Sequence, residues 1–395
     1  MTNEYRPLFN RKYISGLMWF SLLAILILST MGPGEVEFYP VESNRDKTVY
    51  WMELDEQPIT LTLLLPTGEA INSTQRQLQQ LKSHIIQSRL QKFSSPNYSY
   101  SVIPRQDRIE ITFGWNQQHV PELDAIWDSL TQPIETSQWQ AELKNIQARH
   151  YLSSQTPDQM VAEQFFIQLQ PDTGGVLDQL PAAYHRMFQA PRYAISGDSA
   201  DELVSLVEKQ LPQHSSAQQR QKPIPTRQQS ITEVHEGANY RLLIGRSISA
   251  RNSELYIEER ITAHLLQQLL TQQQSQHKVS FRLLWAALET TGYQAFILEG
   301  RSNPGPMLSQ LQQQVTEELV EVSQKQLAEQ WHERMRDLAN QTQALNLIAF
   351  YSLPEDTMEN YTDQILDQDP DEIIIAARKA LQTNEQISIL HTPAL

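Results

Sequence analysis

The chain carries one order of predicted elements twice, and this internal duplication limits its fold more than any other feature of the sequence. In the first half an apolar strand, LTLLLP (61–66), leads into a helix with QLQQLKSHIIQSRLQ. In the second half the strand YRLLIG (240–245) leads into a helix with EERITAHLLQQLLTQ, and His84 and His264 fall at matching points of the two helices. One matching pair can arise by chance, but an order shared over about 150 residues indicates a duplicated unit.

The later parts of the two halves also correspond. Strand pairs follow the helices, YSYSVIPRQDRIEITFGW (98–115) and FRLLWAALETTGYQAFILEG (281–300), each with two β-branched or aromatic runs around a short turn. Helical stretches come next, and each half closes on a helix followed by a short strand, RYAISG or QISIL. The sequence therefore predicts an α+β fold of two homologous α/β units, each ordered β–α–β–β–α–α–α–α–β, with an antiparallel sheet covered by helices.

The boundary between the two units is predicted from composition. The segment 212–236 is polar and rich in glutamine, and it contains Pro223 and Pro225, which is typical of a linker. We therefore assign the first unit to 47–211 and the second unit to 237–395.

The N-terminal segment predicts one transmembrane helix before the two units. Residues 13–31 carry no charge and would span roughly 28 Å as a helix, close to the thickness of a bilayer core. Basic residues lie before this run and acidic residues after it, so the positive-inside rule places 1–12 in the cytoplasm. Residues 32–46 then form a tether.

These features predict a single-pass protein of the inner (cytoplasmic) membrane, with its soluble part in the periplasm or outside the cell. A cleaved signal peptide is the rival interpretation, but the apolar run is long and Ser29-Thr30-Met31 is a poor cleavage site. A buried core helix is a further alternative. The run is apolar on all faces and lies at the terminus, which favours an anchor.

Charge and residue content exclude several classes of function. The formal net charge is −15, and an acidic surface repels phosphate backbones, so no nucleic-acid partner is expected. The chain has no cysteine, which excludes disulfides, thiolate zinc sites and cysteine nucleophiles. No phosphate-binding glycine loop and no G-x-S-x-G motif occurs. The sequence predicts no cofactor.

The duplicated unit, the opening LTLLLPTGEA and the stretch RYAISGDSADELVSLVEKQLP resemble the insulinase/pitrilysin/mitochondrial processing peptidase family. The resemblance covers roughly 47–390. It implies a zinc metallopeptidase fold in which four such units form a chamber, and this chain would supply two of them. It also implies an H-x-x-E-H motif on the first helix of the first unit, where two histidines hold zinc and the glutamate activates water.

The corresponding helix departs from that motif, because it reads His84-Ile85-Ile86-Gln87-Ser88. Gln87 stands where the general base would be, and an amide cannot accept a proton at neutral pH. Ser88 stands at the second ligand position and is a poor zinc ligand. His84 could still bind a metal, but a lone histidine between apolar neighbours is more often a packed, hydrogen-bonded residue, and His264 favours that shared explanation.

The resemblance also implies a downstream glutamate as the third zinc ligand. If Pro157 matches a proline that often follows that glutamate, Ala148 or Arg149 takes the ligand position. Another alignment brings in Glu163. In either case one histidine and at most one carboxylate remain, which predicts a degenerate site with no catalytic residue and no bound metal.

A second family feature is an arginine–tyrosine pair, R-x6-Y, that holds substrate. Tyr361 stands at the matching place, but Pro354 replaces the arginine. Arg334 or Arg336 could replace it through space. We predict a substrate contact for Tyr361, against the alternative that its ring packs on a neighbouring helix.

Three functions follow from these observations. The first is a catalytically silent, membrane-anchored half that partners an active zinc peptidase of the same family and holds a peptide or an unfolded polypeptide. The second is a membrane-tethered peptide-binding or scaffold module with no peptidase partner, which binds extended peptides at a sheet edge. The third is an active metallopeptidase with unusual ligands.

Overall fold

The computed structural model describes residues 36–115, 120–171, 174–213 and 228–394, together with Met18, Trp19 and Ser21. Almost all of the predicted anchor at 13–31 lies outside these residues. Across the part of the chain that is described, no helix has both the length and the apolar character needed to cross a bilayer. Residues 1–12, 32–35 of the predicted tether and 214–227 of the predicted linker also lie outside the described ranges. The tether at 32–46 is a correction in part, because Glu42–Ser43 within it forms a short strand of the first sheet.

The first unit follows the predicted order from its third strand onward. In chain order its elements are β1 (Glu42–Ser43), β2 (Val49–Glu53), β3 (Ile59–Pro66), α2 (Ser73–Leu90), η1 (Gln91–Phe93), β4 (Tyr98–Pro104), β5 (Arg108–Trp115), α3 (Leu123–Leu130), η2 (Thr136–Trp139), α4 (Gln140–Ser154), α5 (Pro157–Leu169), α6 (Val176–Arg186), β6 (Arg192–Gly197) and α7 (Ala200–Gln210). The strands form a six-stranded sheet in the order β1-β2-β6-β3-β5-β4.

The second unit repeats this order with one additional helix. Its elements are β7 (Gln229–His235), β8 (Tyr240–Ile248), α8 (Tyr256–His277), β9 (Ser280–Ala287), β10 (Gly292–Gly300), α9 (Gly305–Gln314), α10 (Glu317–Met335), α11 (Leu338–Tyr351), α12 (Thr357–Leu366), α13 (Pro370–Ala380), η3 (Thr383–Glu385) and β11 (Ile387–Pro393). Its strands form a five-stranded sheet in the order β7-β11-β8-β10-β9. The predicted α+β class, with a sheet covered by helices in each unit, is confirmed. The predicted antiparallel sheets are wrong in part, because β2 pairs in parallel with β6 and β7 pairs in parallel with β11, so both sheets are mixed.

The predicted end of the linker, at residue 236, is wrong. Gln229–His235, within 212–236, is the strand β7, which pairs in parallel with β11. The polar residues of this segment suggested a linker, but β7 lies at the edge of the sheet and pairs with β11 alone among the described strands. An edge strand tolerates polar residues. The second unit therefore begins before residue 237.

Local signals explain where several elements begin and end. Asn72 caps α2, because its side chain accepts a hydrogen bond from the Gln75 amide at 2.8 Å. Gly197 ends β6 with φ +132°, where a Cβ would lie 2.7 Å from the Pro58 carbonyl oxygen, so the close approach requires glycine. The Glu53 carboxylate then accepts bonds from the Ala200 and Asp201 amides at the start of α7.

Each sheet buries one face under the helices of its own unit. In β3 the residues at alternate positions, Ile59, Leu61, Leu63 and Leu65, pack with α2, α4 and α6 in one core. In the second unit the corresponding face packs against α8, α10 and α13. In both units, therefore, the core forms where the apolar face of an alternating strand pattern packs against the apolar faces of helices.

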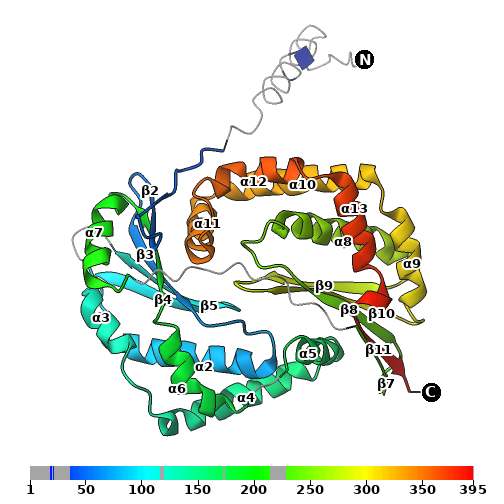
Figure 1. The fold of residues 1–395 in the computed structure, drawn as a ribbon, viewed down its shortest axis with the longest axis horizontal. Helices are drawn as coiled ribbons and strands as arrows, with labels where there is room; N and C mark the ends of the chain where they lie inside the picture. The colour runs from blue at the N-terminus through cyan, green and yellow to red at the C-terminus, as the bar shows by residue number, and fades with distance from the viewer. Residues whose placement is uncertain are drawn as a thin grey trace, which may run out of the picture. The chain divides into compact units, whose positions relative to one another are not determined.

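The opposite face of each sheet is covered by a helix from the other unit (Figure 1). Helix α5 of the first unit packs on β8 and β11, and α11 of the second unit packs on β2, β3 and β6. Phe165 of α5 lies in one core with Leu243 and Ile389. Phe165-Phe166 and Phe350-Tyr351 thus lie on two helices that the units exchange, and this exchange joins the units through buried apolar side chains.

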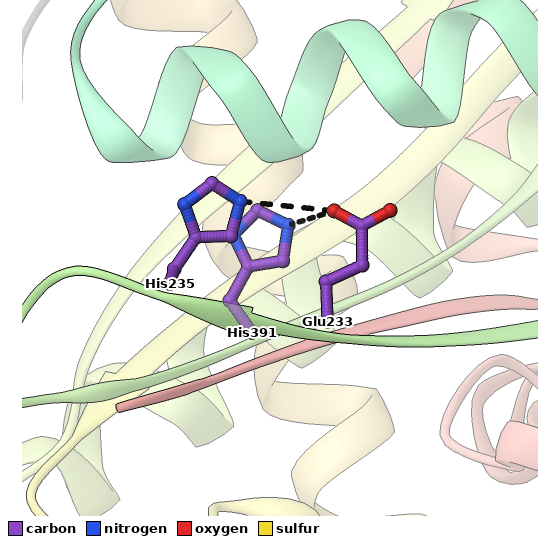
Figure 2. A group of neighbouring side chains, drawn as sticks. All are labelled: Glu233, His235 and His391. Carbon is purple, nitrogen blue, oxygen red and sulfur yellow. Dashed lines mark ion pairs between the residues drawn. The ribbon is translucent and has the colours of Figure 1, made fainter. Parts of the chain in front are cut away.

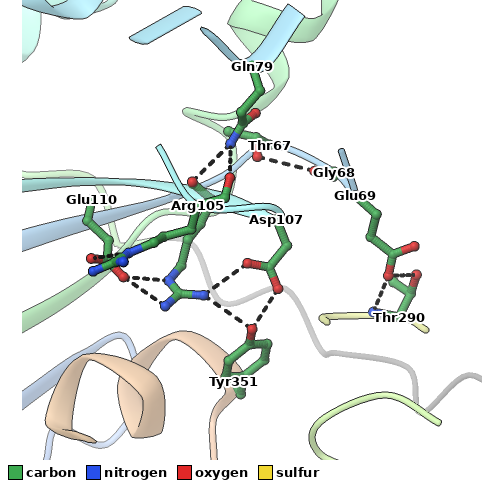
Figure 3. A network of polar contacts seen from close by, with 10 residues as sticks. Thr67, Gly68, Glu69, Gln79, Arg105, Asp107, Glu110, Thr290 and Tyr351 are labelled. Atoms are coloured by element: carbon green, nitrogen blue, oxygen red, sulfur yellow. Dashed lines mark hydrogen bonds and ion pairs between the residues drawn. The ribbon is translucent and has the colours of Figure 1, made fainter. Parts of the chain in front are cut away.

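A buried polar network also joins the units (Figure 3). Arg108 donates to Asp107 at 2.9 Å and pairs with Glu110 at 2.7 Å, while the Tyr351 hydroxyl donates to Asp107 at 2.7 Å. Nearby, one Glu69 oxygen accepts bonds from the Thr290 amide and hydroxyl at 2.8 and 2.6 Å. The hairpin turn of each unit therefore makes hydrogen bonds to the other unit.

Candidate functional site

The helix that resembles the metal-binding helix of the peptidases is α2. His84 is half-buried on it, and Gln87 and Ser88 are exposed one turn later. The Nδ1 atom of His84 lies 2.7 Å from Oε1 of Glu142 on α4. The first ligand position thus faces a carboxylate, while the positions of the base and of the second imidazole hold an amide and a hydroxyl.

Glu142 was not among the residues predicted for the third ligand. Arg149, which one alignment places at that position, lies about two turns further along α4. Its Nη2 is 3.3 Å from the same Glu142 oxygen. Glu163 instead pairs with Arg76 and accepts a bond from Gln159. No local pattern links His84 to Glu142, because they lie on different helices and only the packing of α2 on α4 brings them together.

The chemistry available at this position is limited. One imidazole and one carboxylate converge, whereas zinc in a catalytic site takes three protein ligands and a water. The guanidinium of Arg149 also competes for the carboxylate. As arranged, Glu142 pairs with Arg149 and lies within hydrogen-bonding distance of the His84 ring, and the three side chains form one polar cluster on the surface of the first unit.

His264 differs from its counterpart His84. It is buried in α8, and its Nε2 lies 2.8 Å from the Gln268 amide nitrogen. Burial, with a smaller effect from Arg260, lowers the pKa of the His264 imidazole to about 4. His264 is therefore a buried, hydrogen-bonded residue of the core. His84 is only half-buried, and its ring nitrogen contacts the Glu142 carboxylate.

Tyr361 lies inside the second unit. Its ring packs against Trp331 with centroids 4.3 Å apart, and burial raises the pKa of its phenol above the ordinary value. It lines a cavity of about 290 Å³ together with Arg251 and Tyr256. Its predicted substrate contact stays a prediction, since ring packing alone explains this placement.

The two arginines suggested for Tyr361 have other partners. Arg334 donates to Gln343 at 3.1 Å, and Arg336 pairs with Glu333 at 2.8 Å. The arginines whose charges lower the pKa of the Tyr361 phenol, against the larger effect of burial, are Arg260 and Arg251.

A second cluster was missed in the sequence. Glu233, His235 and His391 place one ligand atom each within 4.8 Å of one another, and among the described residues they are the one group of three potential metal ligands (Figure 2). Glu233 and His235 lie in the segment predicted to be a linker, so the sequence did not indicate that they share a sheet with His391. The alternation ITEVH (231–235), typical of a strand, was the available signal.

The comparisons with known proteins bear on the fold. No family model matches the sequence, and no curated protein matches it. Among solved structures, an M16 peptidase inactive domain from Pseudomonas fluorescens matches with a TM-score of 0.67 at 14% identity, over 90% of this chain and 98% of that one.

Two larger proteases match over part of their length. The periplasmic protease PqqL from Escherichia coli gives a TM-score of 0.62 at 13% identity, over 91% of this chain and 46% of that one. Pitrilysin gives 0.59 at 11% identity, over 91% of this chain and 43% of that one. The chain has the fold of pitrilysin-like M16 peptidase domains.

Proposed function

We propose that this chain is a membrane-anchored, catalytically inactive insulinase/pitrilysin-like protein that acts as the partner, or substrate-holding half, of an active zinc peptidase. One observation carries the proposal. At the position of the metal helix, His84 meets a carboxylate that Arg149 already engages, and Gln87 and Ser88 replace the base and the second ligand. This arrangement supports a role without metal-activated water.

The share of each similar structure that this chain matches supports the existence of a partner. The chain matches less than half the length of two proteases, PqqL and pitrilysin, and nearly the whole of a domain described as inactive. A chain with two units would complete a four-unit chamber by pairing with another two-unit chain. The uncharged run at 13–31 would hold it at the membrane.

Purification from membranes tests the partnership. The full chain, tagged at its C-terminus and solubilised in mild detergent, is expected to bring down a protein that contains H-x-x-E-H. Peptide cleavage by the co-purified sample should stop when metal is chelated. A monomer with no co-purifying peptidase would contradict the proposal, as would chelator-sensitive cleavage by the chain alone.

Restoring the motif tests the aligned helix. Gln87→Glu with Ser88→His supplies the missing base and imidazole, and Arg149→Ala frees Glu142. We expect the triple variant to bind one more zinc ion per chain than the unmodified protein, because two imidazoles and a carboxylate then converge. Gln87→Glu alone is the matched control and should gain none. Equal zinc content in the triple variant and the unmodified chain would show that α2 does not occupy the metal-helix position.

A second function, peptide binding without a peptidase partner, is favoured by the open edge of the first sheet. Strand β4 is the last strand in the sheet order and pairs with β5 alone among the described strands. A cavity of about 260 Å³ lies beside Tyr98 at its start. An extended peptide could add a strand there. Fluorescence anisotropy with labelled extended peptides checks this, and no binding at high micromolar concentration would exclude it.

A further inference from the structure

Strands β7 and β11 bring three potential metal ligands to one face of the second sheet. Residues at alternate positions of β11, Ile387 and Ile389, pack against α5, and His391 is the next residue on that face. On β7, Ile231 packs against the same core, so Glu233 and His235 follow on the same face. The parallel register pairs Glu233 directly with His391, so all three side chains converge (Figure 2).

The distances are close to those of a metal site. Nε2 of His235 and Nε2 of His391 lie 3.7 and 3.9 Å from Oε2 of Glu233, and the two imidazole rings stack with centroids 4.0 Å apart. Tetrahedral zinc with ligands at about 2.1 Å holds neighbouring ligand atoms about 3.4 Å apart. The two glutamate–histidine distances therefore exceed this zinc value by about 0.3 and 0.5 Å, and all three ligand atoms lie within 4.8 Å of one another.

The surroundings position the ligands and leave access for an ion. Gln164 of α5 places its Oε1 2.9 Å from His391 Nε2, and it donates through Nε2 to Glu233 at 2.8 Å. The His391 side chain is 2% exposed, whereas His235 and Glu233 are 30% and 44% exposed. The cluster is thus anchored on its inner side and open on the β7 side, where water could supply a fourth ligand.

The neighbouring charges are balanced. Arg241 lies opposite His391 across β8 and β11, and it pairs with Asp158 at 2.9 Å and with Glu299 at 2.8 Å. Its positive charge is therefore offset by carboxylates outside the cluster, which reduces its repulsion of a bound cation.

We propose that Glu233, His235 and His391 bind a divalent transition metal ion, for which zinc is the probe, and that the ion ties the edge strand β7 to β11. Two neutral imidazoles and one carboxylate form a ligand set that suits zinc. Gln164 would give up one or both of its present bonds when the ion enters. The site lies on the second unit and is independent of the α2 helix and of any catalytic role.

Zinc titration of the full chain in detergent tests the site. The protein carries a tag without histidine, is stripped with chelator, and is titrated with zinc sulfate by calorimetry and by metal analysis after desalting. We expect one zinc ion per chain. His235→Ala and Glu233→Ala each should weaken binding at least about 100-fold, more than the loss of an outer-shell partner would. Both side chains are partly exposed, so these variants should fold.

His84→Ala is the matched control, because it removes a histidine that pairs with a glutamate elsewhere on the surface. It should keep the zinc ion. Absence of zinc binding in the unmodified chain, unchanged binding in His235→Ala, or loss of binding in His84→Ala would each overturn the proposal.

Amide hydrogen exchange tests the tie between the strands. Zinc should slow exchange in β7 of the unmodified chain and leave it unchanged in His235→Ala, since the ion bridges β7 to β11 in the former alone. Equal exchange in β7 with and without bound zinc would show that the ion does not hold the edge strand.

Discussion

At the scale of single residues, the buried lysine Lys82 makes the free energy of unfolding depend on pH. Its side chain is 1% exposed in the first unit, and Nζ donates to the Thr67 carbonyl at 3.1 Å. Burial, with a smaller effect from Arg186, lowers the pKa of the Lys82 ammonium to about 7. Above that pH the folded chain releases this proton while the unfolded chain retains it.

Stability should therefore rise with pH in this window. Between about pH 7 and pH 10 the unfolded state binds more protons at this site, so Lys82 should add up to about 1.4 kcal/mol per pH unit to the free energy of unfolding. We expect Lys82→Met to remove this rise and to be the more stable protein near pH 6.5. Urea denaturation at several pH values measures both slopes. Equal slopes would refute the assigned pKa.

At the scale of elements, the exchange of α5 and α11 depends on close packing. A Cβ at Gly245 of β8 would lie 2.6 Å from both Phe165 of α5 and Ala295 of β10. Gly245→Ala should therefore cost about 1–3 kcal/mol through overpacking. Phe165→Leu makes room, so the double variant should lose less stability than the sum of the single variants by at least about 0.5 kcal/mol.

Gly114→Ala is the matched control on the first sheet. The nearest atom to its added Cβ would be the Ser99 hydroxyl at 3.3 Å, which can rotate away, so a loss below about 1 kcal/mol is expected. Chemical denaturation of the four variants measures these differences. Additive losses at Gly245 and Phe165 would mean that α5 does not press on β8.

At the scale of the whole molecule, the exchanged helices and the buried network predict that the two units unfold together. Tyr351→Phe removes the hydroxyl that bonds Asp107 across the units. We expect a loss of about 1–3 kcal/mol, because a buried carboxylate loses one partner. The change should lower the stability of both units equally.

Hydrogen exchange followed by mass spectrometry can separate the units. Amides of β5 and β10 should exchange with the same free energy of opening, and Tyr351→Phe should reduce both by the same amount. If β5 loses protection while β10 keeps it, the units unfold independently and the network does not couple them.

The sequence by itself determined the repeated order of elements and the degenerate motif. Period-2 strands and apolar helix faces repeat along the chain, and a duplicated order of elements needs no knowledge of contacts. The identities of His84, Gln87 and Ser88 within one helix likewise suffice to show that the H-x-x-E-H spacing is broken. Such features depend on neighbours within a turn or two of the chain.

Tertiary structure alone decided which distant residues meet. Helix packing gives His84 the partner Glu142 in place of Arg149 or Glu163. A polar edge strand resembles a linker until β11 pairs with it, and that pairing assembles Glu233 with His391. The physical reason is that local periodicity fixes which face of an element is buried, whereas the partner of that face depends on contacts between residues far apart in the chain.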